Sequence, residues 1–291
     1  MNATISNRGG RLATLAVGTI LFAAAGCGGS DDDESTAASE PTTAETASTD
    51  GEALAAAVDE YAAYVRREAA ALTDSTAEFV AAVDAGEVER AKEIYPSARV
   101  HFERIEPVAS AFGDLDPDID GRAGDIPPDE WGGYHRIEKA LWVHGSTKGL
   151  EPITAELVDD VGNLDAVANR EEFEAPDIAQ GSVDLLGEVS ASKITGEEER
   201  YSHTDLWDFE ANVQGAEAGF DALKPTLERA DPKLVAEIEK QFEAMYDLLD
   251  GYRRGDGFVL YDTLTPKDTR ELARQVDALA ESLSRVPSLV G

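Results

Sequence analysis

Apolar side chains recur every three or four residues along most of this chain, which is the spacing of one face of an α-helix. The longest series runs from Leu54 to Val83 without a break. A second predicted helix covers residues 87–112, and Pro96 and Pro107 are expected to kink or interrupt it. The pattern therefore predicts two long helices at the start of the folded region.

The next segment, residues 114–128, is rich in Pro, Gly and Asp, which predicts a loop. After this loop, Asp129 is suited to cap the N-terminus of a third helix that continues through Leu141. Apolar positions at 157–164 indicate a fourth helix, and the charged, proline-containing stretch 170–177 is the expected boundary between two lobes.

The second half of the chain repeats this helical spacing. Its expected helices lie at 177–192, 202–227 and 231–249, with a last one from Thr265. Residues 258–261 resemble a strand, but the chain lacks the alternation of strands and helices that a parallel sheet requires. The sequence thus predicts an all-α domain over 51–291, made of two packed helical bundles that form lobes at about 51–172 and 173–291.

The first thirty residues carry the features of an export signal. Arg8 and Arg11 precede an apolar run over 12–25 that is too short to span a bilayer. The run ends in Ala-Ala-Gly followed by Cys27, which resembles a bacterial lipobox. This resemblance implies that residues 1–26 are a signal peptide and that Cys27 becomes a lipidated N-terminus. The alternative is an ordinary secretory signal with an incidental cysteine.

Cys27 is the single cysteine in the chain, so an internal disulfide, a cysteine zinc site and a thiol nucleophile are all excluded. Residues 27–50 are acidic and polar, with too little apolar surface to bury, and are expected to form a disordered tether. The predicted protein is therefore exported and held by its lipid at the outer face of the cell membrane, or in the periplasm.

The formal net charge is −34, from 59 acidic and 25 basic residues. Such a surface repels the phosphates of nucleic acid, which is therefore excluded as a partner. It attracts cations or a basic protein. A role in solubility alone is an equally good explanation of the acidity.

The pair His135 and Glu138 is the most informative local signal for chemistry. At this i, i+3 spacing both side chains lie on one helical face, where an imidazole and a carboxylate are able to share a metal ion. A simple ion pair is the more common outcome of the same spacing. A second pattern, Asp116 to Gly121, begins like a calcium-binding EF-hand loop, but the twelfth position is Pro127 instead of the required Glu.

Common catalytic motifs are missing from the sequence, among them H-E-x-x-H, G-x-S-x-G and a phosphate-binding glycine loop. The paired E-x-x-H motifs of di-iron bundles are missing as well. Three tryptophans could form an aromatic platform for a glycan, but their helical spacing with Leu and Ile favours positions in the core. The residues therefore indicate a binding protein rather than an enzyme.

Several segments together resemble the imelysin-like proteins, in particular their EfeO/EfeM branch. The G-x-H-x-x-E signature of these proteins is present at Gly133 to Glu138. Further similar segments are 103–107, 112–116, 193–198 and 201–209. They occur in order across both predicted lobes, so the resemblance extends over about residues 55–290.

The resemblance implies an extracytoplasmic metal-binding component of an iron uptake system, which acts with a membrane iron permease and a haem-containing peroxidase. Matching positions imply one metal site formed by Glu103, Asp116, His135 and Glu138. Three carboxylates and an imidazole suit ferric or ferrous iron, with zinc, copper or calcium as other candidates. By the same resemblance, His203 and Asp205 form a second candidate site.

Two alternatives to iron binding remain open. The wider imelysin group carries a peptidase label, so a metallopeptidase is one of them, although the sequence offers no residues for hydrolysis. The other is a polysaccharide-binding lipoprotein with structural calcium. Larger members of the branch also have an N-terminal cupredoxin domain, which this sequence lacks, so copper-assisted oxidation is not expected.

Overall fold

The computed structural model describes residues 43–291, with side chains from residue 51 onward. The expected signal peptide, Cys27 and most of the expected tether lie outside this range. The first helix, α1 (Thr43–Asp84), includes residues 43–50, which the sequence had suggested were part of the tether. These residues follow Pro41 and include Ala and Glu. Adding residues to an existing helix requires no new nucleation, so the helix extends into them.

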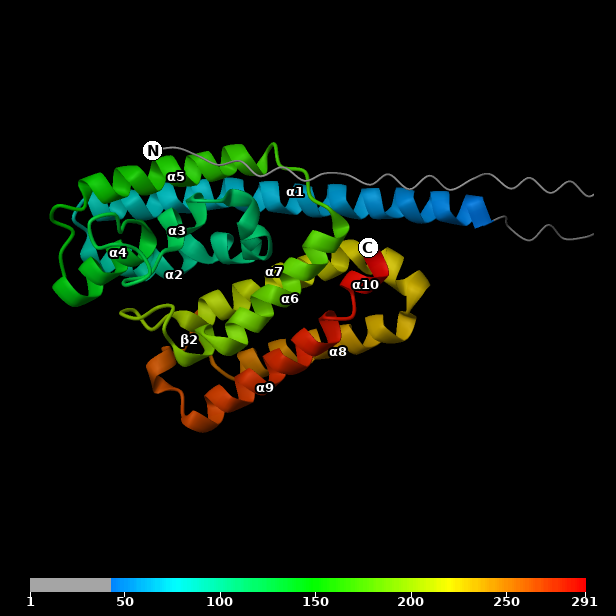
Figure 1. Ribbon diagram of the computed structural model, residues 1–291. Coiled ribbons are helices and arrows are strands. Elements are labelled where there is room, and N and C mark those ends of the chain that lie inside the picture. Colours follow the sequence, from blue (N-terminus) through cyan, green and yellow to red (C-terminus); the bar gives the residue numbers. More distant parts are fainter. Residues whose placement is uncertain (1–42) are drawn as a thin grey trace, which may run out of the picture. The chain divides into compact units, whose positions relative to one another are not determined.

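The first bundle is formed by α1, α2 (Val88–Ile105), α4 (Gly133–Lys139) and α5 (Glu151–Ala168), and Figure 1 shows α5 lying along α1. The short helix α3 (Leu115–Asp120) packs against α4 and α5. Pro96 lies inside α2 without ending it, whereas Pro107 lies in the first turn of the 3-10 segment η1 (Glu106–Phe112), just after the end of α2.

The second bundle consists of four longer helices followed by a short one. They are α6 (Ala175–Ala191), α7 (Asp205–Ala230), α8 (Pro232–Asp250), α9 (Pro266–Leu283) and α10 (Pro287–Val290). The two bundles meet where α7 packs against α1 and α2, and where α6 packs against η1 (Figure 1). The expected all-α fold of two packed bundles is confirmed.

At this junction two glycines allow backbones to touch. A Cβ atom on Gly181 of α6 would lie 1.9 Å from the carbonyl oxygen of Pro107, and one on Gly215 of α7 would lie 2.4 Å from that of Arg104. Both distances are far below van der Waals contact, so glycine is required for this close packing. The bundles are thus joined through main chain as well as through side chains.

Three short segments differ from the sequence prediction. The expected loop 114–128 contains α3, and α4 begins after Gly132, so Asp129 is not its N-cap. The strand expected at 258–261 is reduced to Gly257–Phe258, strand β2, which pairs with β1 (Arg253–Arg254). Segments of two to six residues contain too few apolar positions to show a period, which explains these errors.

Other start signals were read correctly. Asp231 accepts hydrogen bonds from the backbone N–H groups of Lys233 and Leu234 at the start of α8, and Thr265 forms a capping box with Asp268 at the start of α9. Short segments complete the description: η2 (Ala140–His144), η3 (Lys193–Thr195) and η4 (Tyr261–Thr263). Across residues 43–291, no helix has the length and apolar character needed to cross a bilayer.

The tryptophans contribute to packing. Trp131 is buried and donates a hydrogen bond to the carbonyl oxygen of Gly121 at 2.7 Å. Trp142 and Trp207 are half-buried against the core, where they meet Tyr95 and Phe258 in edge-on ring contacts. These positions favour the core role over an aromatic platform for glycans.

Candidate metal centre

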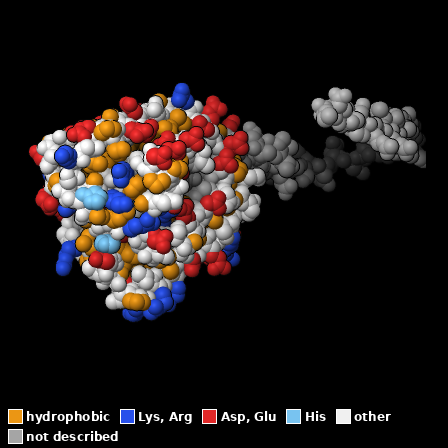
Figure 2. All heavy atoms as spheres, turned by 60° about the vertical axis from the view of Figure 1, so that its left-hand side comes forward, with side chains coloured by type: hydrophobic (Ala, Val, Ile, Leu, Met, Phe, Trp, Pro, Cys, Tyr) orange, Lys and Arg blue, Asp and Glu red, His pale blue; other side chains and the backbone are white. Residues whose placement is uncertain are grey.

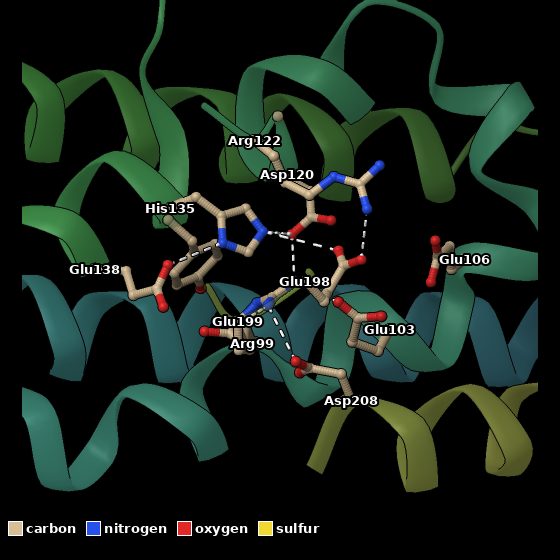
Figure 3. Close-up of polar contacts among 12 residues, drawn as sticks. Arg99, Glu103, Glu106, Asp120, Arg122, His135, Glu138, Glu198, Glu199 and Asp208 are labelled. Atoms are coloured by element: carbon tan, nitrogen blue, oxygen red, sulfur yellow. Dashed lines mark hydrogen bonds and ion pairs between the residues drawn. The ribbon is translucent and has the colours of Figure 1, made fainter. Parts of the chain in front are cut away.

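His135, on α4 of the first bundle, lies at the centre of a buried group of carboxylates (Figure 3). Its Nε2 atom lies 3.5 Å from Oδ1 of Asp120 and 3.8 Å from Oε1 of Glu198. Its Nδ1 atom lies 3.4 Å from Oε2 of Glu138, one helical turn further along α4. Each ring nitrogen therefore faces a different carboxylate.

Two sets of potential metal ligands share this imidazole. Asp120, His135 and Glu198 form one set, and His135, Glu138 and Glu199 form the other; within each set the donor atoms lie within 4.8 Å of one another. Oxygen donors with an imidazole suit iron and other first-row metal ions. The Nε2 atom of His135 is buried and lacks a hydrogen-bond partner among the described residues. Such an atom is costly to bury unless something else satisfies it.

Glu138 connects α4 to the loop that precedes α7. Its Oε1 atom accepts hydrogen bonds from the backbone N–H groups of Tyr201, at 2.8 Å, and Ser202, at 2.7 Å. Burial opposes ionisation of Glu138, but His135 and these two donors outweigh it and lower the pKa of Glu138. The carboxylate is therefore held in its ionised form beside His135.

Arg99 on α2 supplies the central positive charge. Its guanidinium is fully buried and pairs with Glu103, Asp120, Glu199 and Asp208, with the Nη1 atom 3.2 Å from Oδ2 of Asp208. Burial opposes ionisation of Asp120, but Arg99 and His135 outweigh it and lower the pKa of this carboxyl group. Arg99 thus holds carboxylates from both bundles in place.

The carboxylates also affect His135 itself. Burial and the Arg99 charge oppose protonation of the imidazole, yet its contacts with Asp120 and Glu138 outweigh both and raise the pKa of His135 to about 9. The anionic neighbours of this imidazole therefore outweigh its burial.

Of the four residues expected to form the main site, His135 and Glu138 lie together, and Glu103 and Asp116 belong to neither ligand set. Glu103 pairs with Arg99, and its Oε2 atom accepts from Nζ of Lys193 at 3.0 Å and from Nδ2 of Asn212 at 2.8 Å. Its carboxylate is already neutralised by protein cations.

Asp116 lies outside the buried group, half-exposed at the wall of a cleft. Burial raises the pKa of Asp116 to about 6, and the charge of Asp120 adds to this effect. The cleft has a volume of about 390 Å³. Its charged lining residues are Glu106, Asp116, Asp120, Arg122, Asp125, Asp184, Glu188 and Glu198. Asp120 and Glu198 also face His135, so the acidic cleft and the buried group share two carboxylates.

The second expected pair, His203 and Asp205, belongs to no ligand set within the described residues. His203 is half-exposed and adopts a left-handed backbone conformation with φ of 60°. Asp205 is buried, and its Oδ1 atom accepts from the backbone N–H of Glu199 at 3.1 Å. Burial raises the pKa of Asp205 to about 7. Its observed contact supports the loop that carries Glu199.

The sequence interpretation did not identify Asp120, Glu198 or Glu199 as site residues. Asp120 had been considered as part of a calcium loop, and Glu198 as part of a similar segment, but nothing local connects them to His135. Arg99 was missed as well, although its i, i+4 spacing to Glu103 was visible in the sequence.

Comparisons with known proteins show which family the chain is similar to. A family model described as imelysin, Peptidase_M75, matches residues 57–286. An Efem/EfeO family lipoprotein of Staphylococcus haemolyticus is 41% identical over 281 residues, which cover 95% of this chain and 98% of that protein. The iron uptake system component EfeO of Escherichia coli K12 is 41% identical over 254 residues, which cover 86% of this chain and 68% of that protein.

Proposed function

Because the chain belongs to the imelysin family, we propose that it is the extracytoplasmic iron-binding component of an iron uptake system. In this proposal Cys27 carries a lipid that holds the protein at the outer face of the cell membrane, and the helical domain binds iron and passes it to a membrane permease. The names of the two relatives, a lipoprotein and an iron uptake component, support this assignment.

The observation that carries the proposal is the unsatisfied Nε2 atom of His135. It is buried among carboxylates of Asp120 and Glu198, while Glu138 and Glu199 lie on the other side of the ring. A bound iron ion would satisfy the nitrogen and reduce the repulsion among the carboxylates. The other residues expected from the family resemblance, Glu103, Asp116, His203 and Asp205, would act around this centre rather than as its core.

The acidic cleft supports a role in cation transfer. Its carboxylates attract cations from solvent, and two of them, Asp120 and Glu198, face the imidazole. We assign a membrane iron permease as the acceptor and a haem-containing peroxidase of the same system as a second partner, on the basis of the family resemblance.

Carriage of iron fits the site better than peptide hydrolysis does. Next to His135 and Glu138, the space lined by Arg122, Arg200 and Tyr201 is too small to admit a water molecule. A metallopeptidase needs room for a metal-bound water and a peptide at the same place. The protein is therefore expected not to cleave denatured protein substrates.

Iron titration of the wild type and two histidine variants tests the proposal. His135→Ala removes the central ligand and should weaken iron binding on the order of a hundredfold, which corresponds to about 2.7 kcal/mol. The control His144→Ala alters an exposed histidine at the end of the same helical region and should bind like the wild type. Zinc, copper and calcium titrations give the selectivity. Unchanged iron affinity in His135→Ala would contradict the assignment.

A further inference from the structure

We propose that Arg122 is a displaceable counter-cation, which neutralises Glu198 while the site is empty and moves aside when a metal cation binds. This inference rests on the proposed function, since it concerns how the same site takes up and gives back its ion. It adds to that function a residue, Arg122, that competes with the iron ion for the carboxylate of Glu198.

The contacts of Glu198 support this role. The side chain is 3% exposed, and its Oε2 atom lies 2.9 Å from Nη1 of Arg122, which is a close ion pair. Its other oxygen, Oε1, has looser neighbours, with Nε2 of His135 at 3.8 Å and Nζ of Lys193 at 3.9 Å. Of these three cations, Arg122 has the one contact within hydrogen-bond distance.

Arg122 also lies at the right place to control access. It lines both the acidic cleft and the closed space beside His135 and Glu138. Figure 3 shows its guanidinium on the side of Glu198 away from Arg99. A cation that binds Glu198 from the cleft therefore competes with this guanidinium for the carboxylate.

A second anion offers Arg122 a partner after displacement. Its Nε atom lies 3.1 Å from Oδ2 of Asp125, which is exposed at the cleft wall. The planar guanidinium therefore binds two carboxylates at once, one buried and one at the surface. When iron takes Glu198, the contact with Asp125 remains, so the charge of Arg122 stays paired.

Competition for one carboxylate has a direct thermodynamic consequence. Two cations that compete for the same carboxylate group weaken each other's binding by the same factor. Arg122 thus lowers the affinity of the site for iron. When the ion leaves, the ion pair between Arg122 and Glu198 forms again. For a carrier that must hand over its cargo, this exchange makes release easier.

Metal titration of the purified protein carrying Arg122→Gln tests the inference. The variant lacks the guanidinium that competes with iron for Glu198. It should therefore bind iron roughly tenfold more tightly than the wild type. The matched control is Arg200→Gln, which also removes one positive charge from the lining of the closed space beside His135 and Glu138. Arg200 donates a hydrogen bond to the carbonyl oxygen of Ala123 and lines the same closed space. Its variant should stay within about twofold of the wild type.

Two further measurements separate the outcomes. Arg122→Lys keeps the charge without the planar fork and should fall between the wild type and Arg122→Gln. Thermal unfolding of each metal-free variant reports whether it is folded. Equal affinities of Arg122→Gln and Arg200→Gln, or weaker binding by Arg122→Gln in a folded protein, would overturn the inference. If the wild type itself binds no iron, the proposed function fails instead.

Discussion

Buried charges that balance one another dominate the candidate site at the level of single residues. Arg99 and Lys193 each contact more than one carboxylate, and Glu103 contacts both of them. Removing one partner from such a group leaves a buried charge without compensation, which is more costly than the pair is favourable. The charged groups around His135 are therefore expected to affect folding as well as ion binding.

Glu103→Gln tests this at one position. The variant leaves Arg99 and Lys193 with one carboxylate fewer, so the free energy of unfolding should fall by about 3–5 kcal/mol. Its iron affinity should fall less than that of His135→Ala, because Glu103 belongs to neither ligand set. Urea denaturation of the metal-free protein and iron titration measure the two effects.

Glu106→Gln is the matched control, since Glu106 contacts the same Lys193 at 2.7 Å. Burial raises the pKa of Glu106 well above its ordinary value, although the Lys193 charge opposes this, so ionisation is less favoured at Glu106 than at Glu103, whose pKa is lowered by Lys193 and Arg99. Its variant should lose less stability. A Glu103→Gln protein of normal stability that no longer binds iron would identify Glu103 as a ligand, as the family resemblance implies.

Site residues that are close to each other in the sequence could be predicted to lie together, and residues far apart in the sequence could not. His135 and Glu138 were recognisable because one helical turn joins them. Glu198 and Glu199 reach His135 only after the loop before α7 has packed against α4, so no local spacing shows their proximity. Glu103 has the right residue type for a ligand, but whether it meets a metal or Lys193 is decided by the position of η3, 90 residues later.

At the level of elements, the long helices were predictable and the short ones were not. Helices α7 and α9 show many turns of one apolar face, whereas α3 has six residues and presents a single buried side chain, Ile119. The consequence matters for the site because Asp120 is the last residue of α3. A loop prediction at 114–128 left the position of this ligand undefined.

Where α3 packs against α5, ionisation of Asp160 on α5 is expected to lower the free energy of unfolding in a pH-dependent way. Burial, followed by the charges of Asp118, Glu156 and Asp159, raises the pKa of Asp160 from 3.8 to about 6. Ionisation in the folded state is therefore unfavourable relative to the unfolded state, and this cost develops as the pH rises from about 4 through 6.

Asp160→Asn should consequently be more stable than the wild type at pH 8 and equal to it near pH 4. The gain should be at most about 1 kcal/mol, because the side chain is half-exposed and water and salt screen its charge. Asp159→Asn, at the exposed neighbouring position, is the control for the loss of one surface charge. Denaturation at both pH values measures the difference, and a gain that is the same at pH 4 and pH 8 would refute this origin.

At the level of the whole molecule, the net charge of −34 favours contact with cations, and the expected lipid on Cys27 would attach the protein to the membrane. Cys27→Ser removes the thiol that lipid attachment requires, so the protein should move from the membrane fraction to the soluble extracytoplasmic fraction. Immunoblots of the two fractions measure this. The same variant should keep its iron affinity, because Cys27 precedes the helical domain. Unchanged membrane association would mean that the anchor lies elsewhere.

The main-chain contacts at Gly181 and Gly215 determine which movements are available to the protein. Backbones that already touch at two places cannot slide or rotate past each other without steric overlap. These contacts therefore disfavour a hinge motion between the two bundles. Uptake and release of an ion then depend on small displacements within the two bundles, such as those of Arg122 and the segment that carries it. In kinetic terms, exchange would be limited by side-chain and loop rearrangement rather than by domain opening.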